Sequence, residues 1–382
     1  MRLGVLGGTF NPVHNAHIQM ALLAKKALSL DEVLIMVAAD PPHKRVDGHV
    51  PAETRFRMAE MAAEGIEGVT PSDLELRRKG KSYTVDTLET LKKLYPDAEI
   101  TLIIGSDTMQ DFMTWHRPKD IVSLCELACV PRKGLTNADK VAAAALRRDL
   151  GAKLTMLPSG ADAISSTLVR ESVTNAKPIG GFVCAKVEWH IYENALYFPP
   201  ELSALEARCR ELLTEKRFEH TVGTMIESVR LAALWGADGR KARLAALLHD
   251  CAKNMDKARL AILSGDDSGI AAVQHAFAGA VAARDELGVS DADVLRAVRL
   301  HCTGERNMTT LEKIVYLADI TEPTRDFEGV ESYRKALKKG ENEAMLYALT
   351  QTKKRLAANH EDFHPASQRA LDYFQNMKEE NH

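Results

Sequence analysis

The sequence lacks the features that mark membrane, secreted and nucleic-acid-binding proteins. None of its apolar runs approaches the roughly 18 residues that a transmembrane helix needs. The formal net charge of the 382 residues is −3, which gives no reason to expect a nucleic acid or an anionic membrane as a partner. The short apolar start has no signal-peptide cleavage pattern. We therefore expect a cytoplasmic protein that acts on small ligands.

Cysteine is sparse, and its spacing excludes two common uses of this residue. The six cysteines, at positions 125, 129, 184, 209, 251 and 302, contain no CxxC pair. They are therefore expected to be reduced thiols rather than a disulfide framework or a zinc ribbon. The sequence also has no low-complexity segment and no repeat shared by its two halves.

What the sequence does have is enough length for more than one hydrophobic core. With 382 residues, 45% hydrophobic and 27% charged, two domains are the default expectation. In the first half, short β-branched runs alternate with helix-periodic segments, which predicts an α/β, Rossmann-like fold with a mainly parallel sheet. The expected strands are 3–6, 33–37, 100–104, 127–130 and 154–157, and helices are expected to begin near residues 16, 52, 85, 118 and 138. Ligands of such sheets bind beyond the carboxyl ends of the strands.

The second half is predicted to be all-α. Helical periodicity covers 204–215, 220–235, 241–249, 256–263, 275–287, 292–300, 311–320, 342–359 and 365–375. The last helical piece of the first half cannot continue through Pro199 and Pro200, because proline lacks the N–H and clashes with the preceding turn. We therefore expect two domains, residues 1–198 and 199–382.

The first chemically distinctive segment follows the N-terminal strand. Gly7, Gly8 and Thr9 leave backbone N–H groups that can approach a phosphate closely. His14 and His17 are three residues apart, so on a helix they share one face, near its positive end. Two imidazoles there can hydrogen-bond the phosphates of a nucleoside triphosphate and stabilise a departing pyrophosphate. Catalysis would then need only positioning and charge stabilisation.

A second phosphate-binding segment is predicted at residues 164–170. Hydroxyls at a helix N-terminus, followed one turn later by Arg170, combine backbone amides with a cation. This segment resembles the ISSTxIR motif of the nucleotidyltransferase superfamily. The loop of residues 7–17 resembles the GGTFxPxHxGH motif of the same superfamily.

Further segments narrow the resemblance to the nicotinate-nucleotide adenylyltransferases. The matching segments are 41–44, 72–77, 81–88, 105–107, 115, 131–134 and the helix ending at 196–197, so the resemblance covers about residues 1–198. It implies transfer of AMP from ATP to nicotinate mononucleotide, giving deamido-NAD and pyrophosphate. Mg²⁺ would be carried on the ATP phosphates.

The same resemblance assigns site residues. The implied catalytic residues are His14, His17 and Lys44. The implied ATP- and substrate-binding residues are Gly7, Gly8, Thr9, Phe10, Thr84, Gly105, Asp107, Trp115, Arg132, Ile164, Ser165, Ser166, Thr167 and Arg170. Trp115 would stack on the pyridine ring.

Two positions depart from the family pattern. Ala16 stands where the family usually has Gly, and its methyl group would crowd the phosphates slightly. His116 stands where Tyr often follows the tryptophan, which leaves the second aromatic contact open. Nicotinamide mononucleotide is the alternative acceptor.

The second half carries a dispersed set of metal-ligating side chains. The set is His220, His249, Asp250, His275, His301 and Asp319. Four imidazoles and two carboxylates are too many for one closed structural zinc, but they suffice for two adjacent metals with open positions. Such a pair binds a phosphate and generates hydroxide for in-line attack. Lys253 and Arg325 are predicted to hold phosphate oxygens.

The order of these residues resembles the HD-domain phosphohydrolases and, more narrowly, the symmetrical diadenosine tetraphosphatases, over about residues 201–370. The resemblance implies that the six residues are metal ligands, with Asp250 catalytic, and that diadenosine tetraphosphate is cut into two ADP. It also implies two transition-metal ions, with iron the implied metal and manganese, cobalt and zinc compatible. Cys302 stands where the family commonly has Thr, beside a ligand, which predicts sensitivity to oxidation.

Two alternatives for the second half stay open. It could hydrolyse another nucleotide, such as a guanosine polyphosphate or a nucleoside monophosphate, or it could be a nucleotide sensor without turnover. The sequence predicts no oligomeric state.

Overall fold

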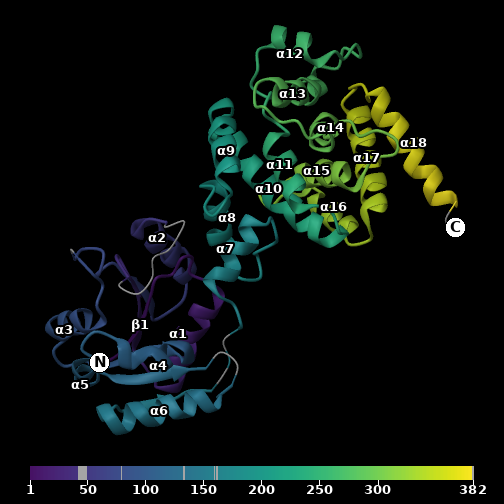
Figure 1. Ribbon diagram of the computed structural model, residues 1–382. Helices are drawn as coiled ribbons and strands as arrows, with labels where there is room; N and C mark the ends of the chain where they lie inside the picture. Colours follow the sequence, from purple (N-terminus) through teal and green to yellow (C-terminus); the bar gives the residue numbers. More distant parts are fainter. Residues whose placement is uncertain (42–49, 79, 132–133, 159, 161, 381–382) are drawn as a thin grey trace. The chain divides into compact units, whose positions relative to one another are not determined.

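The computed structural model describes residues 1–41, 50–78, 80–131, 134–158, 160 and 162–380 (Figure 1). The chain forms two compact units. The first consists of Met1–Glu171 and Ile179–His190, and the second of Ser172–Pro178 and Ile191–His382. The two units exchange short segments between residues 171 and 191, and the domain boundary between residues 198 and 199 stays a prediction.

The first unit is built on a six-stranded parallel sheet with the order β3-β2-β1-β4-β5-β6, which confirms the predicted fold class. The strands are β1 Arg2–Gly8, β2 Glu32–Val37, β3 Val69–Ser72, β4 Glu99–Gly105, β5 Glu126–Val130 and β6 Leu154–Met156. The sequence does not predict β3, because its four residues include Pro71 and only one strongly apolar side chain. Proline is tolerated there because β3 lies at the edge of the sheet.

Helices cover this sheet (Figure 1). They are α1 Asn15–Ala27, α2 Ala52–Ala63, α3 Thr84–Leu94, α4 Ser106–Asp111, α5 Pro118–Leu124 and α6 Asn137–Leu150. Two further helices, α7 Ser166–Thr174 and α8 Ala185–Glu193, each begin in the first unit and end in the second. Leu3 and Val5 of β1 share a core cluster with Leu88 and Leu91 of α3. Because side chains alternate along a strand, the residues between them face the opposite side of the sheet.

The strand order places one crevice at the carboxyl edge. The chain runs from β1 outward to β2 and β3, and then returns to β4 on the other side of β1. Leu6 pairs with Ile103, so the ends of β1 and β4, at Gly8 and Gly105, lie close together. This reversal of strand order is where open α/β sheets bind ligands.

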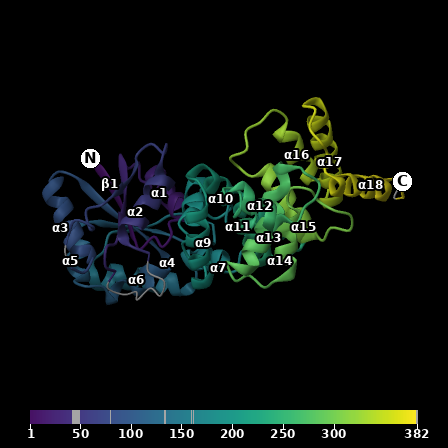
Figure 2. The same ribbon diagram turned by 90° about the horizontal axis from the view of Figure 1, so that it is seen from above.

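The second unit is helical, as predicted (Figure 2). Its helices are α9 Pro200–Leu212, α10 Glu215–Trp235, α11 Gly239–Leu248, α12 Lys257–Ser264, α13 Gln274–Asp285, α14 Ala292–Leu300, α15 Thr310–Thr321, α16 Val330–Leu337, α17 Glu341–Ala358 and α18 Pro365–Glu380. No helix continues through Pro199 and Pro200, as predicted: α8 ends at Glu193, and Pro200 begins α9, because proline is favourable at the first helical position. The eight-residue α16 is not predicted by the sequence analysis.

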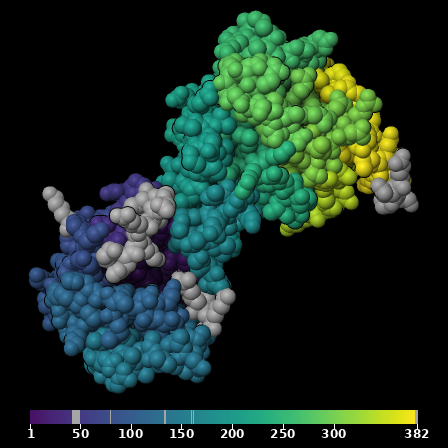
Figure 3. Space-filling view, viewed as in Figure 1, coloured from purple at the N-terminus to yellow at the C-terminus, as the bar shows by residue number. Residues whose placement is uncertain are grey.

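Helices from distant parts of the second half share one core. Leu231 of α10, Leu317 of α15, Met345 of α17 and Phe374 of α18 are buried in the same cluster. Figure 3 shows α17 and α18, drawn in yellow-green and yellow, on the surface of this unit. Among the described residues, no helix has both the length and the apolarity to cross a bilayer.

Candidate functional site

The start of α1 holds the two predicted histidines side by side. His14 is the N-cap residue and His17 the third helical residue, and their rings stack with centroids 3.6 Å apart. The backbone N–H of His14 donates to His17 Nδ1 at 3.2 Å. Because Nδ1 accepts this bond, a neutral His17 carries its proton on Nε2, where it can be donated to a phosphate oxygen. The ring of Phe10 meets that of His17 edge-on, with centroids 4.8 Å apart.

The second predicted phosphate-binding segment lies against this histidine loop. Ser166 Oγ donates to the carbonyl of Pro12 at 2.9 Å across 154 residues of sequence. Arg170 Nη1 donates to the carbonyl of Asn11 at 2.8 Å, and its Nη2 donates to Thr167 Oγ1 at 3.2 Å. The loop that leads into α1 therefore packs against α7. The N–H groups at the two helix N-termini and the Arg170 guanidinium are groups suited to an anion.

Sequence analysis missed Arg55, which is 0% exposed in α2. Its guanidinium donates to the carbonyls of Thr9, Ala39 and Val50 at 2.5, 3.2 and 3.1 Å. Thr9 follows β1 and Ala39 follows β2, so Arg55 ties together two loops at the carboxyl edge of the sheet. An arginine in a helix normally reads as a surface residue. Its position three residues before buried Met58 is the one sequence signal of an inward orientation.

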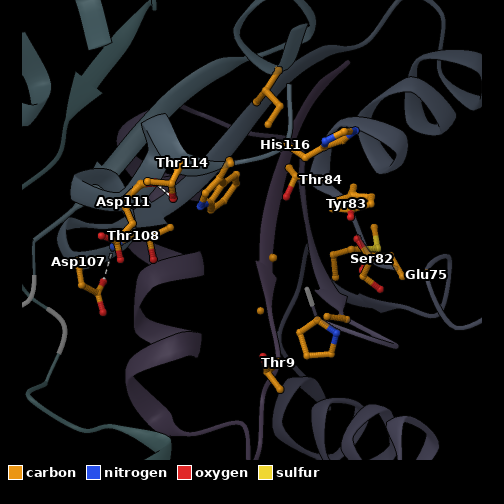
Figure 4. A pocket seen from close by; sticks show the side chains of 17 residues that line it. Thr9, Glu75, Ser82, Tyr83, Thr84, Asp107, Thr108, Asp111, Thr114 and His116 are labelled. Carbon is orange, nitrogen blue, oxygen red and sulfur yellow. Dashed lines mark hydrogen bonds between the residues drawn. The ribbon is translucent and has the colours of Figure 1, made fainter. Parts of the chain in front are cut away.

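A cavity of about 550 Å³ opens at this edge, within the range of small-molecule sites (Figure 4). The predicted binding residues that line it are Gly7, Gly8, Thr9, Thr84, Asp107 and Trp115. Figure 4 shows Asp107 on one side, Ser82 and Tyr83 on the opposite side, and Thr9 at the base between them.

Aromatic rings line one part of this cavity. Trp115 stacks on buried Phe112, with ring centroids 5.0 Å apart and an interplanar angle of 27°. Tyr83 and His116 also line the cavity, with ring centroids 4.4 Å apart. The imidazole of His116 thus provides an aromatic surface at the position where Tyr often follows the tryptophan in the related family. Flat apolar surfaces of this kind suit a pyridine or purine ring.

The remaining predicted residues of this unit have more varied positions. A Cβ at Gly105 would lie 2.7 Å from Asp107 Oδ1, so glycine gives this carboxylate its room. Ile164 is buried just before α7, and Ser165 Oγ accepts from the backbone N–H of Leu168, the third residue of α7, at 3.1 Å. Lys44 and Arg132 lie outside the described residues, so their roles stay predictions.

The second unit brings its predicted ligands into one buried cluster. His220 Nε2 lies 3.3 Å from His249 Nε2, and His275 Nε2 lies 3.3 Å from His301 Nε2. Asp250 lies between these pairs, with Oδ2 3.5 Å from His249 Nε2 and Oδ1 3.1 Å from His275 Nε2. One carboxylate can therefore serve two adjacent metal positions.

Backbone carbonyls orient two of these imidazoles. His249 and His301 directly follow α11 and α14, as their C-cap residues. His249 Nδ1 lies 2.6 Å from the carbonyl of Ala246, and His301 Nδ1 lies 2.7 Å from that of Val298. A carbonyl can only accept, so Nδ1 carries the proton and each Nε2 presents a lone pair to the cluster.

His220 is held by two carboxylates. Its Nε2 lies 2.9 Å from Asp319 Oδ1, and its Nδ1 lies 3.1 Å from Glu322 Oε1. Glu322 is fully buried, and sequence analysis missed it. The available signal was its spacing, three residues after Asp319 at the end of α15. Gly223 leaves room for this carboxylate, because a Cβ there would collide with it.

Three cationic side chains contact the cluster. Arg217 Nη1 donates to Asp250 Oδ2 at 2.9 Å, and Arg325 Nη2 donates to Asp319 Oδ1 at 2.6 Å. Lys253 Nζ lies 3.1 Å from His275 Nε2. Lys253 and Arg325 were predicted from the sequence, whereas Arg217 was not. All three can bind phosphate oxygens at the edge of the cluster.

The electrostatics of the cluster shift His249 and the two carboxylates towards the forms that bind metal ions. Burial lowers the pKa of His249, which favours the neutral imidazole. Burial alone would raise the pKa of Asp250, but the surrounding histidines hold that pKa well below its ordinary value. Burial opposes ionisation of Asp319 as well, and His220 outweighs it, so the pKa of Asp319 is also lowered.

The pKa values of the other imidazoles shift the other way, although burial opposes it. Neighbouring carboxylates raise the pKa of His220. Cys302 and Asp250 raise the pKa of His275 and His301.

This donor set fits divalent metal ions. Bonds of about 2.0–2.1 Å to nitrogen place two ligand nitrogens of a tetrahedral site about 3.3 Å apart, and both imidazole pairs have this spacing. The residues that would hold one ion are His220, His249, Asp250 and Asp319, and those that would hold the other are Asp250, His275 and His301.

A second cavity, of about 420 Å³, reaches the cluster at Cys302. Phe363, Arg355 and His360 contribute an aromatic ring, a guanidinium and an imidazole to its lining. Apolar and cationic groups therefore line a cavity to which one residue of the cluster also contributes.

Comparisons with known proteins match the two halves separately. Residues 5–172 match the cytidylyltransferase-like family, and residues 217–324 match the HD domain. A probable nicotinate-nucleotide adenylyltransferase of Geobacter metallireducens is 45% identical over 37% of this chain and 66% of its own length. One of Clostridium botulinum is 36% identical over 51% of this chain and 98% of its own. A crystal structure of a predicted HD superfamily hydrolase involved in NAD metabolism, from Clostridium acetobutylicum, is 34% identical over 46% of this chain and 97% of its own, with a TM-score of 0.44.

Proposed function

The chain belongs, through its first half, to the nicotinate-nucleotide adenylyltransferase family and carries an HD domain in its second half, and from this premise we propose that it catalyses two reactions. The first is transfer of AMP from ATP to nicotinate mononucleotide, giving deamido-NAD and pyrophosphate. The second is symmetrical hydrolysis of diadenosine tetraphosphate to two ADP. The six free cysteines are consistent with a reducing compartment, and we propose the cytoplasm as the location.

The packing of the loop before α1 against α7, together with the aromatic-lined cavity at residues 7–9, carries the first proposal. The ATP phosphates, with their Mg²⁺, would lie across the two helix N-termini, where His17 Nε2 and Arg170 donate to phosphate oxygens. Nicotinate mononucleotide would occupy the cavity, with its pyridine ring against Trp115.

In this arrangement the 5′-phosphate of the mononucleotide attacks the α-phosphorus of ATP in line. A new P–O bond forms, and the bond between the α-phosphorus and the bridging oxygen of pyrophosphate breaks. The developing charge on pyrophosphate is stabilised by the imidazole and guanidinium donors. The attacking phosphate is already an anion, so no side chain has to remove a proton from it, and rate enhancement comes from positioning and charge stabilisation.

The buried histidine–aspartate cluster carries the second proposal. Divalent ions bound there would supply positive charge and a water of lowered pKa. We propose iron, the metal that the resemblance implies, although manganese, cobalt and zinc suit the same donors. Arg217, Lys253 and Arg325 would bind the polyphosphate and orient it towards the cluster. The cavity with Phe363 and Arg355 would receive one nucleoside, because a base stacks on an aromatic or guanidinium plane.

The first reaction is tested by initial rates with ATP and either mononucleotide, using the wild type and His17→Ala. We expect a clear preference for nicotinate mononucleotide and a drop in kcat of about 10²–10³ in the variant, the usual cost of losing one preorganised donor. Asp250→Ala is the matched control and should leave these rates unchanged. Equal rates with nicotinamide mononucleotide would replace the proposed acceptor, and an unimpaired His17→Ala enzyme would contradict the proposed phosphate site.

The second reaction is tested by anaerobic incubation of the metal-loaded chain with diadenosine tetraphosphate and chromatography of the products. We expect ADP as the sole product, its formation lost in Asp250→Ala and retained in His17→Ala. AMP plus ATP would show a different cleavage position. No turnover with metal bound would favour another nucleotide substrate or a sensor.

A further inference from the structure

Cys302 adds a sulfur atom to a cluster whose predicted ligands are only nitrogen and oxygen. Its Sγ lies 3.3 Å from His275 Nε2 and 3.2 Å from His301 Nε2. These two nitrogens are themselves 3.3 Å apart, so the three atoms form a nearly equilateral triangle. Bonds of about 2.0–2.1 Å to nitrogen and about 2.3 Å to sulfur separate neighbouring donors of a tetrahedral site by about 3.3–3.6 Å. The triangle is therefore close in size to one face of such a tetrahedron.

A fourth donor lies beside this triangle. Asp250 Oδ1 is 3.1 Å from His275 Nε2 and 3.7 Å from His301 Nε2. We propose that Cys302, as a thiolate, is a ligand of the metal ion held by His275, His301 and Asp250. The proposal rests on metal binding by the HD half, as set out above.

The local backbone explains how two consecutive residues reach one ion. On a regular helix, neighbouring side chains point about 100° apart. His301 is the C-cap of α14, and residues 301–303 form a turn, so Cys302 is released from helical geometry. Its side chain therefore reaches the same cluster as the preceding imidazole.

Cys251 provides the contrast. It too directly follows a predicted ligand, Asp250, and it is buried. Its Sγ, however, donates to the carbonyl of Gly279 at 3.5 Å. Only Cys302 is grouped with histidine nitrogens among the described residues. Adjacency to a ligand alone thus does not make a cysteine a donor.

The sulfur makes the two metal positions chemically different. The position of His220, His249 and Asp250 has imidazole and carboxylate donors among the described residues, whereas the position of His275 and His301 gains a soft thiolate. Thiolate favours zinc, cobalt and iron(II) over manganese. The sulfur-containing position should therefore retain zinc or cobalt when manganese can be exchanged out.

The test is cobalt(II) titration of metal-free full-length protein under anaerobic conditions, followed by absorption spectroscopy. Cobalt bound to nitrogen and oxygen gives only visible ligand-field bands, whereas a thiolate adds a near-ultraviolet charge-transfer band. We expect both features in the wild type and in Cys251→Ser. In Cys302→Thr, which introduces the residue that the related family commonly has, we expect the ligand-field bands alone.

Affinity provides a second readout. Loss of an outer-shell partner alone costs roughly 10–100-fold in metal affinity, so loss of a direct ligand should cost at least as much. Competition with a chromophoric chelator should show this loss for zinc in Cys302→Thr, with a much smaller change for manganese. Far-ultraviolet circular dichroism checks that each variant is folded.

The outcomes separate this proposal from the one on which it rests. Ligand-field bands without a charge-transfer band in the wild type would overturn ligation by Cys302 and leave the histidine–aspartate centre standing. No cobalt bound by folded wild-type protein would overturn both.

Discussion

Single residues in this protein show how burial changes the chemistry of an ordinary side chain. Glu75 is buried at the wall of the N-terminal cavity, where Thr87 Oγ1 donates to its Oε1 at 2.6 Å. Burial raises the pKa of Glu75 above its ordinary value of 4.5, and the hydrogen bond only partly offsets this. The cavity proposed to bind anionic nucleotides is thereby lined by a carboxyl group that ionises reluctantly.

This shift predicts a pH-dependent stability difference. Because the folded state holds the Glu75 proton more tightly than the unfolded state, the contribution of Glu75 to stability is fully present below pH 4.5 and is lost as pH rises towards the folded pKa. Glu75→Gln can still accept a hydrogen bond from Thr87, and its amide does not titrate. The variant should therefore not lose this contribution to stability as pH rises above 4.5. Urea unfolding of both proteins from pH 4 to 8 should show the variant gaining relative to the wild type as pH rises. A constant difference across that range would contradict the shift.

Cys302 predicts a second residue-scale effect. Burial would raise the pKa of its thiol, but the adjacent His301 and His275 outweigh this and lower the pKa to about 6. A thiolate that lines an open cavity is readily oxidised by peroxide. We expect peroxide to inactivate phosphohydrolysis by the manganese-loaded wild type and to spare Cys302→Ser, each measured against its own untreated activity. Equal sensitivity of the two proteins would rule out this thiol as the target.

At the scale of elements, the N-terminal candidate site depends on loops whose backbone carbonyls accept hydrogen bonds from side chains of neighbouring helices. α2 contributes Arg55, whose three hydrogen bonds fix the segments that follow β1 and β2. α7 contributes Ser166 and Arg170, which fix the loop between β1 and α1. The loop that follows β1 thus owes its shape to contacts with two separate helices.

Arg55→Met should therefore affect both stability and transfer. The buried carbonyl of Val50 and the part-buried carbonyls of Thr9 and Ala39 lose their donor. A buried group left unsatisfied costs roughly 1–3 kcal/mol and a part-buried one less, so a total loss of about 2 kcal/mol or more is expected. Urea unfolding measures this loss, and KM for ATP should rise because the Thr9 loop is released.

Arg57→Met in the same helix is the control, since Arg57 is exposed and forms a surface ion pair with Glu60, and should change stability by less than about 0.5 kcal/mol. Similar effects of both substitutions would contradict the role given to Arg55.

At the scale of the whole molecule, the two proposed reactions are assigned to two compact units, each with its own buried core. The described part of the first unit offers phosphate-binding groups but none of the buried histidine–carboxylate clusters found in the second. The two reactions should therefore respond differently to metal removal.

Chelation tests this separation. After treatment with a strong chelator and its removal, hydrolysis should be lost and should return with iron(II) or manganese(II). Adenylyl transfer should need only the Mg²⁺ supplied with ATP. A transfer activity that also required the transition metal would show that the two activities depend on each other.

Most of the helices and strands could be predicted because each depends on a periodic pattern of apolar residues within one short segment. Alternation of short apolar runs with helical periods predicted the parallel sheet, and periodicity alone predicted nine of the ten helices from α9 to α18. The pattern is weak where few residues carry it, as in β3 with its proline and in α16 with its eight residues. His14 and His17 could be paired from their spacing, since three residues along a helix bring side chains to one face.

The sequence by itself determined which chemical groups are present and which lie near one another along the chain. Only the tertiary structure decided which distant groups meet. Arg55, Glu322 and Arg217 have ordinary sequence surroundings, and their importance comes from what folding packs against them. The position of Asp250 between His249 and His275 and the approach of Cys302 to His275 are likewise set by helix packing. The physical reason is that periodicity encodes orientation within one element, whereas distances between elements depend on how their side chains fill the core.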